Sequence, residues 1–178
     1  MTPEYRDNSQ QLGLLQEATT PATPHKTKCA SVPIYKVTLV REGRLHCYHK
    51  QIRSSADAGA LLHAYLANVD REHFVVLMLD QKNKVIGINT VSIGSLTASI
   101  VHPREVFKPA ILSNAAALIL AHNHPSSDCQ PSREDRALTT RLCEAATLLG
   151  LSILDHLIVA TDGSGQFFSF ADEGLLAS

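Results

Sequence analysis

The sequence predicts an α/β (α+β) fold in which helices flank a mixed β-sheet. Apolar runs of strand length occur at 74–79, 115–121 and 152–160. Segments with the apolar periodicity of helices lie among them, the clearest at 54–69 and 132–149. Strands and helices that follow one another along a chain of 178 residues are expected to pack as one sheet covered by helices, because each element must bury its apolar face.

The expected order of elements begins with a tail and a hairpin. Residues 1–30 are rich in Thr, Gln, Pro and Ser, which predicts a disordered tail, and a short helix at 10–18 stays open. We expect the folded domain to occupy residues 31–178. Within it, the β-rich segment 34–40 and the segment 45–52 are predicted to pair as a hairpin across a charged turn that contains glycine.

A helix and three strands are expected next. The helix at 54–69 begins with Ser and Asp at capping-box spacing, and His63 lies off its apolar stripe, which predicts a solvated side chain. The apolar strand 74–79 is followed by a turn and by an antiparallel partner at 85–93. A third strand is predicted at 97–101.

The second half of the chain is predicted to alternate helices with strands. Pro103 suits the first position of a helix, whereas Pro109 is expected to kink or shorten that helix. After the apolar strand comes a helix at 132–149, stopped by a glycine, and then strands at 152–160 and 166–170. The long helix has a predicted core stripe made of Leu138, Leu142, Ala145 and Leu149.

Composition narrows the function classes. Hydrophobic and charged contents of 44% and 19% are typical of a globular chain. The net charge of −1 gives no support to a nucleic-acid partner, because such binding depends on phosphate neutralisation by Lys and Arg. The sequence has no apolar run of membrane-spanning length and no signal-peptide segment, which predicts a cytoplasmic protein without a membrane partner. No CxxC spacing occurs among the four cysteines, which are Cys29, Cys47, Cys129 and Cys143.

Two histidines at the end of the apolar strand carry the chemistry. Strand side chains alternate between faces, so His122 and His124 point the same way and Asn123 points the other way. Asp135 has two open interpretations, since it forms a capping box with Ser132 and can also return to the histidines. Two imidazoles and a carboxylate make a zinc site that keeps a position for water, and zinc lowers the pKa of that water. Such a site needs a general base, usually a glutamate, and Ser132 is placed to stabilise an oxyanion.

The motif resembles that of a known family. His122-Asn123-His124-Pro125, followed by Ser132 and Asp135, is similar to the HxHPx(6)Sx(2)D motif of JAMM (JAB/MPN) metalloproteases, and more specifically to their RadC-like bacterial branch. The likeness covers residues 33–171 and includes three further segments, at 101–107, 115–117 and 154–159.

The resemblance implies a fold, a metal and a reaction. It implies the JAB/MPN (cytidine-deaminase-like) architecture, Zn²⁺, and hydrolysis of a peptide or isopeptide bond in a protein substrate, including a ubiquitin-like conjugate. Glu72 best matches the position of the family's catalytic glutamate, and Glu105 is its rival. The full set of site residues implied by the resemblance is His122, His124 and Asp135 as zinc ligands, with Ser132 and Glu72 as catalytic residues.

The alternative function is a non-catalytic RadC-like module associated with DNA repair or mobile-element DNA transactions. RadC proteins usually carry a helix-hairpin-helix-like segment ahead of this domain, whereas low-complexity residues occupy that place here. Cys129 lies in the loop between the histidines and Asp135 and is left out of the ligand set. Asp155 and His156 either orient a ligand histidine or belong to the core, and both interpretations stay open.

Overall fold

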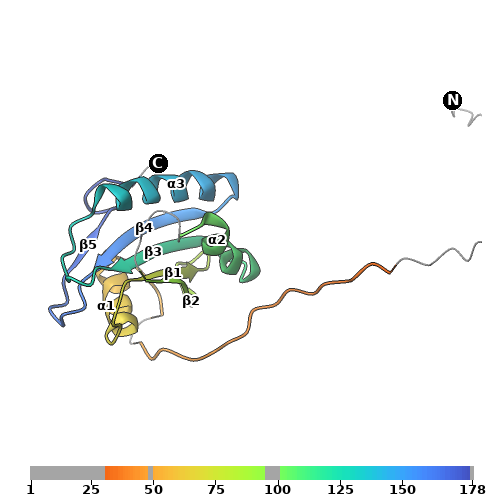
Figure 1. The fold of residues 1–178 in the computed structure, drawn as a ribbon, viewed down its shortest axis with the longest axis horizontal. Coiled ribbons are helices and arrows are strands. Elements are labelled where there is room, and N and C mark those ends of the chain that lie inside the picture. The colour runs from red at the N-terminus through yellow and green to blue at the C-terminus, as the bar shows by residue number, and fades with distance from the viewer. Residues whose placement is uncertain (1–30, 48–49, 95–100, 177–178) are drawn as a thin grey trace, which may run out of the picture. The chain divides into compact units, whose positions relative to one another are not determined.

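The computed structural model describes residues 31–47, 50–94 and 101–176. Its two units are Met1–Lys36, which is described only for 31–36 and has no helix or strand there, and Val37–Ser178. The second unit contains every helix and strand in the described part of the chain (Figure 1). These elements are α1 Ser55–Leu66, β1 His73–Leu79, β2 Val85–Ile93, α2 Pro103–Leu112, β3 Ala117–Asn123, α3 Arg133–Leu148, β4 Ser152–Val159 and β5 Phe167–Ser169.

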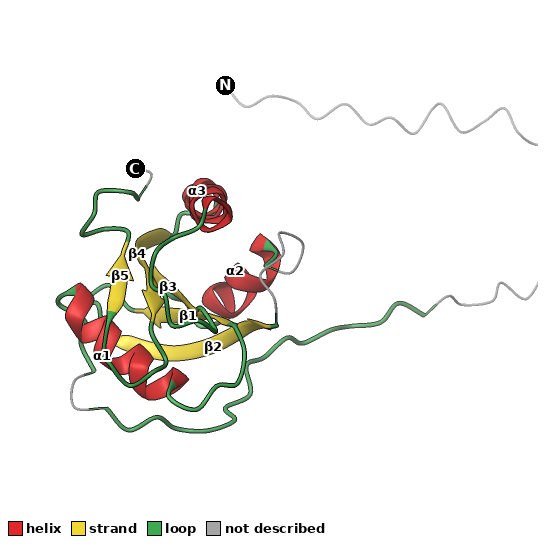
Figure 2. Cartoon of the chain, turned by 60° about the vertical axis from the view of Figure 1, so that its left-hand side comes forward, coloured by secondary structure: helices red, strands yellow, loops and turns green. Residues whose placement is uncertain are grey.

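The strands form one mixed five-stranded sheet in the order β2-β1-β3-β4-β5. The central strand, β3, runs parallel to β4 and antiparallel to β1, and the outer pairs are antiparallel. Helix α1 covers one face of the sheet, and α2 and α3 lie on the other (Figure 2). The predicted α/β class with helices flanking a mixed sheet is confirmed.

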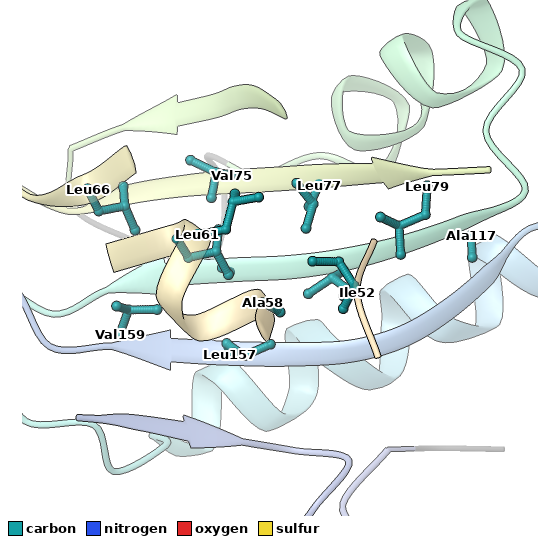
Figure 3. Packing of buried hydrophobic residues seen from close by; sticks show 13 residues of the cluster. Ile52, Ala58, Leu61, Leu66, Val75, Leu77, Leu79, Ala117, Leu157 and Val159 are labelled. Atoms are coloured by element: carbon teal, nitrogen blue, oxygen red, sulfur yellow. The ribbon is translucent and has the colours of Figure 1, made fainter. Parts of the chain in front are cut away.

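Two hydrophobic clusters hold the layers together, and β1 contributes alternately to each. Val75, Leu77 and Leu79 face α1, where they pack with Leu61 and other residues of the first cluster (Figure 3). The residues between them, such as Val76, face α2 and α3. Each fully buried Leu or Val stabilises the fold by about 1.5–3 kcal/mol, which makes the two-sided strand a large contributor.

Strand β3 is buried along its whole length because it has neighbours on both edges and helices on both faces. In the antiparallel pairing with β1, Phe74 is opposite His122. The start of β1 therefore lies beside the end of β3, and the residues just before β1 come close to the histidines. In the parallel pairing with β4, Leu120 is opposite His156.

The predicted hairpin at 34–40 and 45–52 is wrong. Residues 31–47 contain no strand, and their apolar side chains are exposed, with Ile34 at 99% and Val40 at 80%. In the described part of the return arm, Gln51 forms an isolated bridge with Lys84. β-rich composition alone does not make a strand, because a strand needs a neighbour to pair its N–H and C=O groups.

The helices differ from expectation in three respects. Helix α1 ends at Leu66 rather than at 69. Helix α2 continues through Pro109 to Leu112, so the proline does not end it. In the predicted stripe of the long helix, Leu142 is buried and Leu138 and Ala145 pack partly buried against the second cluster, whereas Leu149 is 49% exposed. Besides Leu142, the buried positions of α3 are Asp135, Thr139, Cys143 and Ala146.

His63 also departs from its prediction as a solvated residue. Its ring lies 6.5 Å from that of Phe167 on β5, and its Nε2 is buried without a hydrogen-bond partner among the described residues. The tail at 1–30 and most of the third strand at 97–101 fall outside the described residues. None of the helices in the described part is long and apolar enough to cross a membrane.

Candidate metal centre

Three side chains from two elements converge at the end of β3. His122 Nε2 lies 3.1 Å from His124 Nε2 and 3.2 Å from Asp135 Oδ1. His124 Nε2 lies 3.5 Å from Asp135 Oδ2. The alternation of β3 puts both histidines on one face, as predicted, and the first turn of α3 brings the carboxylate to them. His122 and Asp135 are buried, whereas the His124 side chain is 18% exposed.

These distances suit a small tetrahedral cation. For metal–ligand distances of about 2.0–2.1 Å, neighbouring ligand atoms of a tetrahedral ion lie about 3.3–3.4 Å apart. The three separations in this group, 3.1, 3.2 and 3.5 Å, lie on either side of that value. The donor set of two imidazoles and one carboxylate is also one that zinc accepts. The residues present therefore fit a zinc ion.

A contact within the loop after β3 leaves Nε2 of His124 unprotonated, so that this nitrogen can bind a metal. Its Nδ1 lies 2.6 Å from the carbonyl oxygen of Asp128, and a carbonyl only accepts, so Nδ1 carries the proton. Neutral His124 then directs an unprotonated Nε2 toward a carboxylate. A second proton, on Nε2, would be hydrogen-bonded to the Asp135 carboxylate, and this raises the pKa of His124. Such a group attracts a cation.

Asp135 is held in its ionised form. Burial of its carboxyl opposes ionisation, but the polar contacts with the imidazoles of His122 and His124 and the hydrogen bond from Ser132 outweigh burial and keep the pKa of Asp135 well below its usual range. Ser132 donates its N–H at 2.8 Å and its O–H at 2.6 Å to Oδ2 of Asp135. In return, Asp135 N–H donates to the Ser132 hydroxyl, which completes the predicted capping box. Oδ1 is left to face His122.

Glu72 lies at the same site because of the antiparallel pairing of β1 with β3. Glu72 forms a group with His122 and His124 that could hold a metal ion. One ligand atom from each of the three side chains lies within 4.8 Å of the other two. The backbone around Glu72 is fixed by Asn123, which accepts from His73 N–H at 2.9 Å and donates to the Arg71 carbonyl at 3.1 Å. The middle residue of the histidine motif thus positions the glutamate from the opposite face of β3.

Comparison with known proteins agrees with this geometry. A family model described as the RadC-like JAB domain matches residues 52–175. The chain belongs to the RadC-like JAB domain family. This confirms the resemblance drawn from the histidine motif. The group that could hold a metal ion lies within the matched residues.

Curated relatives of this RadC-like JAB domain come from bacteria and archaea. A UPF0758 protein of Rubrobacter xylanophilus is 54% identical over 125 residues, which cover 70% of this chain and 53% of that protein. A UPF0758 protein of Desulforamulus reducens is 49% identical over 125 residues, covering 70% and 54%. One from Methanococcoides burtonii is 47% identical over 128 residues, covering 72% and 55%. The chain spans about half the length of the curated relatives it matches.

Two other residues considered from the sequence lie apart from the converging group. Glu105, the rival general base, forms an ion pair with Lys108 at 2.7 Å on the exposed surface of α2, and this pairing lowers the pKa of Glu105. Cys129 is half-buried, its Sγ directed to backbone carbonyls, and burial raises the pKa of its thiol, which disfavours the thiolate that binds metal. Leaving Cys129 out of the ligand set agrees with these contacts.

Sequence reasoning missed one buried residue that contacts the surroundings of this group, Thr139. Its hydroxyl donates to the Asp135 carbonyl at 2.7 Å and lies 2.7 Å from His156 Nδ1. His156 Nε2 in turn lies 2.9 Å from His122 Nδ1. Burial strongly lowers the pKa of His156, which keeps its ring neutral. The signal for Thr139 was its spacing: it follows Asp135 by one helical turn, on the same buried face.

Of the two interpretations left open for Asp155, orientation of a ligand histidine and a place in the core, its contacts agree with the second. Its carboxylate accepts from Ser169 Oγ at 2.6 Å, from Ala171 N–H at 3.0 Å and from His156 N–H at 2.7 Å. These partners lie on β5, on the turn after it and on β4 itself. Asp155 therefore ties β5 and the following turn to β4, while its neighbour His156 faces the metal centre.

Proposed function

We propose that this chain is a zinc-dependent metallopeptidase or isopeptidase that hydrolyses a peptide or isopeptide bond of a protein substrate. The observation that carries the proposal is the convergence of His122, His124 and Asp135 at separations suited to a tetrahedral ion, with Glu72 alongside. A zinc ion at such ligands supplies Lewis-acid chemistry, since it lowers the pKa of a water toward neutrality and polarises a carbonyl.

Asp135 is the better third ligand, and this choice assigns a role to Glu72. The Asp135 carboxylate is nearly fully buried, lies 3.2 and 3.5 Å from the two imidazoles and is ionised by its surroundings. Glu72 is half-buried and belongs to a looser group, within 4.8 Å. A carboxylate beside the ligands suits general acid–base work: Glu72 takes a proton from the attacking water and delivers it to the leaving amine.

Ser132 is proposed as the donor to the oxyanion that develops on the substrate carbonyl. Its hydroxyl proton points to Asp135 Oδ2 in this structure. Donation to a substrate therefore requires rotation of the side chain of Ser132, an exposed residue. The backbone N–H of Ser132 stays on Asp135 during that rotation and keeps the carboxylate oriented.

The test separates metal binding from turnover. Purified wild-type protein is expected to contain stoichiometric zinc and to cleave members of a panel of fluorogenic peptides and ubiquitin-like isopeptide conjugates. Glu72→Gln is expected to keep its zinc and to lose hydrolysis by at least about 100-fold, the usual contribution of a general base. Glu105→Gln is the matched control, since it makes the same chemical change on the surface of α2 and should leave zinc and hydrolysis unchanged.

Two results would contradict the proposal. Wild-type protein without zinc after reconstitution would remove the metal centre. Zinc-loaded protein that cleaves no conjugate but binds DNA with a steep dependence on salt would favour the alternative, a non-catalytic module of DNA transactions.

A further inference from the structure

A row of hydrogen bonds runs from the backbone of α3 through the core to His122. It joins the Asp135 carbonyl, the Thr139 hydroxyl and the imidazole of His156, with contacts of 2.7, 2.7 and 2.9 Å ending at His122 Nδ1. All of these side chains are buried, and Thr139 and His156 are 1% and 0% exposed. No water competes for these protons, so the position of each can be assigned from the chemistry of its neighbours.

The assignment starts at the carbonyl, which has no proton to give. An oxygen–oxygen distance of 2.7 Å between Asp135 O and Thr139 Oγ1 requires a proton between them, and only the hydroxyl supplies one. A hydroxyl has one proton, so Thr139 must accept from its other partner. His156 Nδ1 is therefore the donor at 2.7 Å.

The second step passes through the His156 ring. This fully buried imidazole contacts the rings of Phe74 and Phe170, with ring centroids 5.6 and 5.0 Å away, and burial beside apolar rings favours its neutral form. A neutral imidazole with its proton on Nδ1 has a lone pair on Nε2. His122 Nδ1–H must then donate to His156 Nε2, and the proton of His122 is on the nitrogen that faces away from the metal centre.

We infer that Thr139 and His156 are positioning residues that fix His122 in the tautomer whose Nε2 lone pair faces His124 and Asp135. The inference rests on the metal site of the proposed function, and it explains how the buried ligand His122 is kept in the tautomer that can bind the metal. His124 is prepared differently, by the Asp128 carbonyl in the loop. For His122, the same effect comes from the Asp135 carbonyl in α3 and is transmitted through the Thr139 hydroxyl and the His156 ring. Partners of this kind typically change metal affinity by about 10–100-fold.

Thr139→Val tests this row of hydrogen bonds, because valine lacks the hydroxyl and has nearly the same side-chain volume as threonine. Valine removes the hydroxyl and leaves His156 Nδ1–H without an acceptor, so His156 can move its proton to Nε2 and donate to His122 Nδ1. His122 then carries its proton on Nε2 and is a poor ligand. We expect zinc affinity, measured by competition with a chromophoric chelator, to fall about 10–100-fold. Thr139→Ser is the matched control, since it keeps the hydroxyl and should restore affinity to near the wild-type value.

A second measurement needs neither a variant nor a metal. Long-range ¹H–¹⁵N NMR correlations distinguish the two neutral tautomers of histidine, and metal-free wild-type protein should show both His122 and His156 protonated on Nδ1. Protonation of His122 on Nε2 would overturn the inference, as would equal zinc affinities of Thr139→Val and Thr139→Ser. If wild-type protein binds no zinc, the proposed function fails, and the NMR result still decides the tautomer.

Discussion

Replacement of Asp135 by asparagine tests the metal centre most directly. Asn offers one oxygen in place of two, and that oxygen can keep the Ser132 N–H and O–H bonds that cap α3. The amide NH₂ then takes the place of Oδ1 and faces His122, so the variant lacks the negative ligand atom while the cap survives. We expect Asp135→Asn to fold and to lose zinc affinity by at least about 100-fold, the upper end of what indirect partners of a ligand cost.

The expected size of the effect follows from linkage. Zinc at 100 times its dissociation constant stabilises the wild-type fold by about 2.7 kcal/mol. One kcal/mol shifts the Tm of a domain of this size by about 3 °C, so zinc should raise the wild-type Tm by about 8 °C. At the same zinc concentration a variant with 100-fold weaker binding gains only about 0.4 kcal/mol, or about 1 °C. The difference of about 7 °C is easily measured by differential scanning calorimetry.

Each protein is compared with and without zinc, which removes any effect of the substitution on the metal-free fold. Asp128→Asn is the matched control. It makes the same change in the adjacent loop, where the Asp128 carboxylate accepts from Gln130 N–H, and it keeps the backbone carbonyl that binds His124. A zinc-dependent shift in Asp135→Asn equal to that in Asp128→Asn would refute the reasoning and make Glu72 the carboxylate ligand.

Two further predictions concern the fold around the site. Alanine at Gly59 of α1 gains about 1 kcal/mol of helix propensity, but its β-carbon would lie 2.9 Å from Cδ1 and Cε1 of Phe167, an overlap that costs about 1–3 kcal/mol. Urea unfolding should therefore show Gly59→Ala less stable by about 1 kcal/mol, with a smaller loss in a Phe167→Leu background; a more stable variant would contradict the packing argument. Burial raises the pKa of Asp155, despite its hydrogen bond with Ser169, so the folded protein takes up a proton before the unfolded chain as pH falls. The free energy of unfolding of wild type relative to Asp155→Asn should thus increase from neutral pH down to about pH 3.9, and a constant difference would contradict the assignment.

Local patterns were enough to predict the parts of the site that depend on one element at a time. The alternation of β3 predicted that His122 and His124 share a face, and the spacing of Ser132 and Asp135 predicted the start of α3. The prediction that Asp135 lies beside the histidines depended on both of these patterns. A capping residue in the first turn has a known direction, and the short loop from Pro125 returns that turn to the end of the strand.

Patterns failed where the outcome depends on a distant neighbour. The β-rich segment at 34–40 has no strand beside it in the described part of the chain, and its composition could not reveal that. Leu149 fits an apolar stripe by spacing, yet the sheet lies under a face rotated toward Thr139 and Cys143. Thr139 on α3 contacts His156 on β4, and the sequence pattern of the helix alone carries no information about that contact.

The two faces of β3 explain why the site tolerates no shift in this strand. His122 continues the row that includes Leu118 and Leu120 and faces α3, where Asp135 and the hydrogen bonds through Thr139 and His156 lie. Asn123 belongs to the other row and holds the backbone on both sides of Glu72. A slip of the register by one residue exchanges the two faces of the strand. His122 would then point away from Asp135, and the Asn123 side chain would point away from the backbone around Glu72. The two histidines and the glutamate are therefore placed by a single strand, whose register is set in turn by its buried apolar residues.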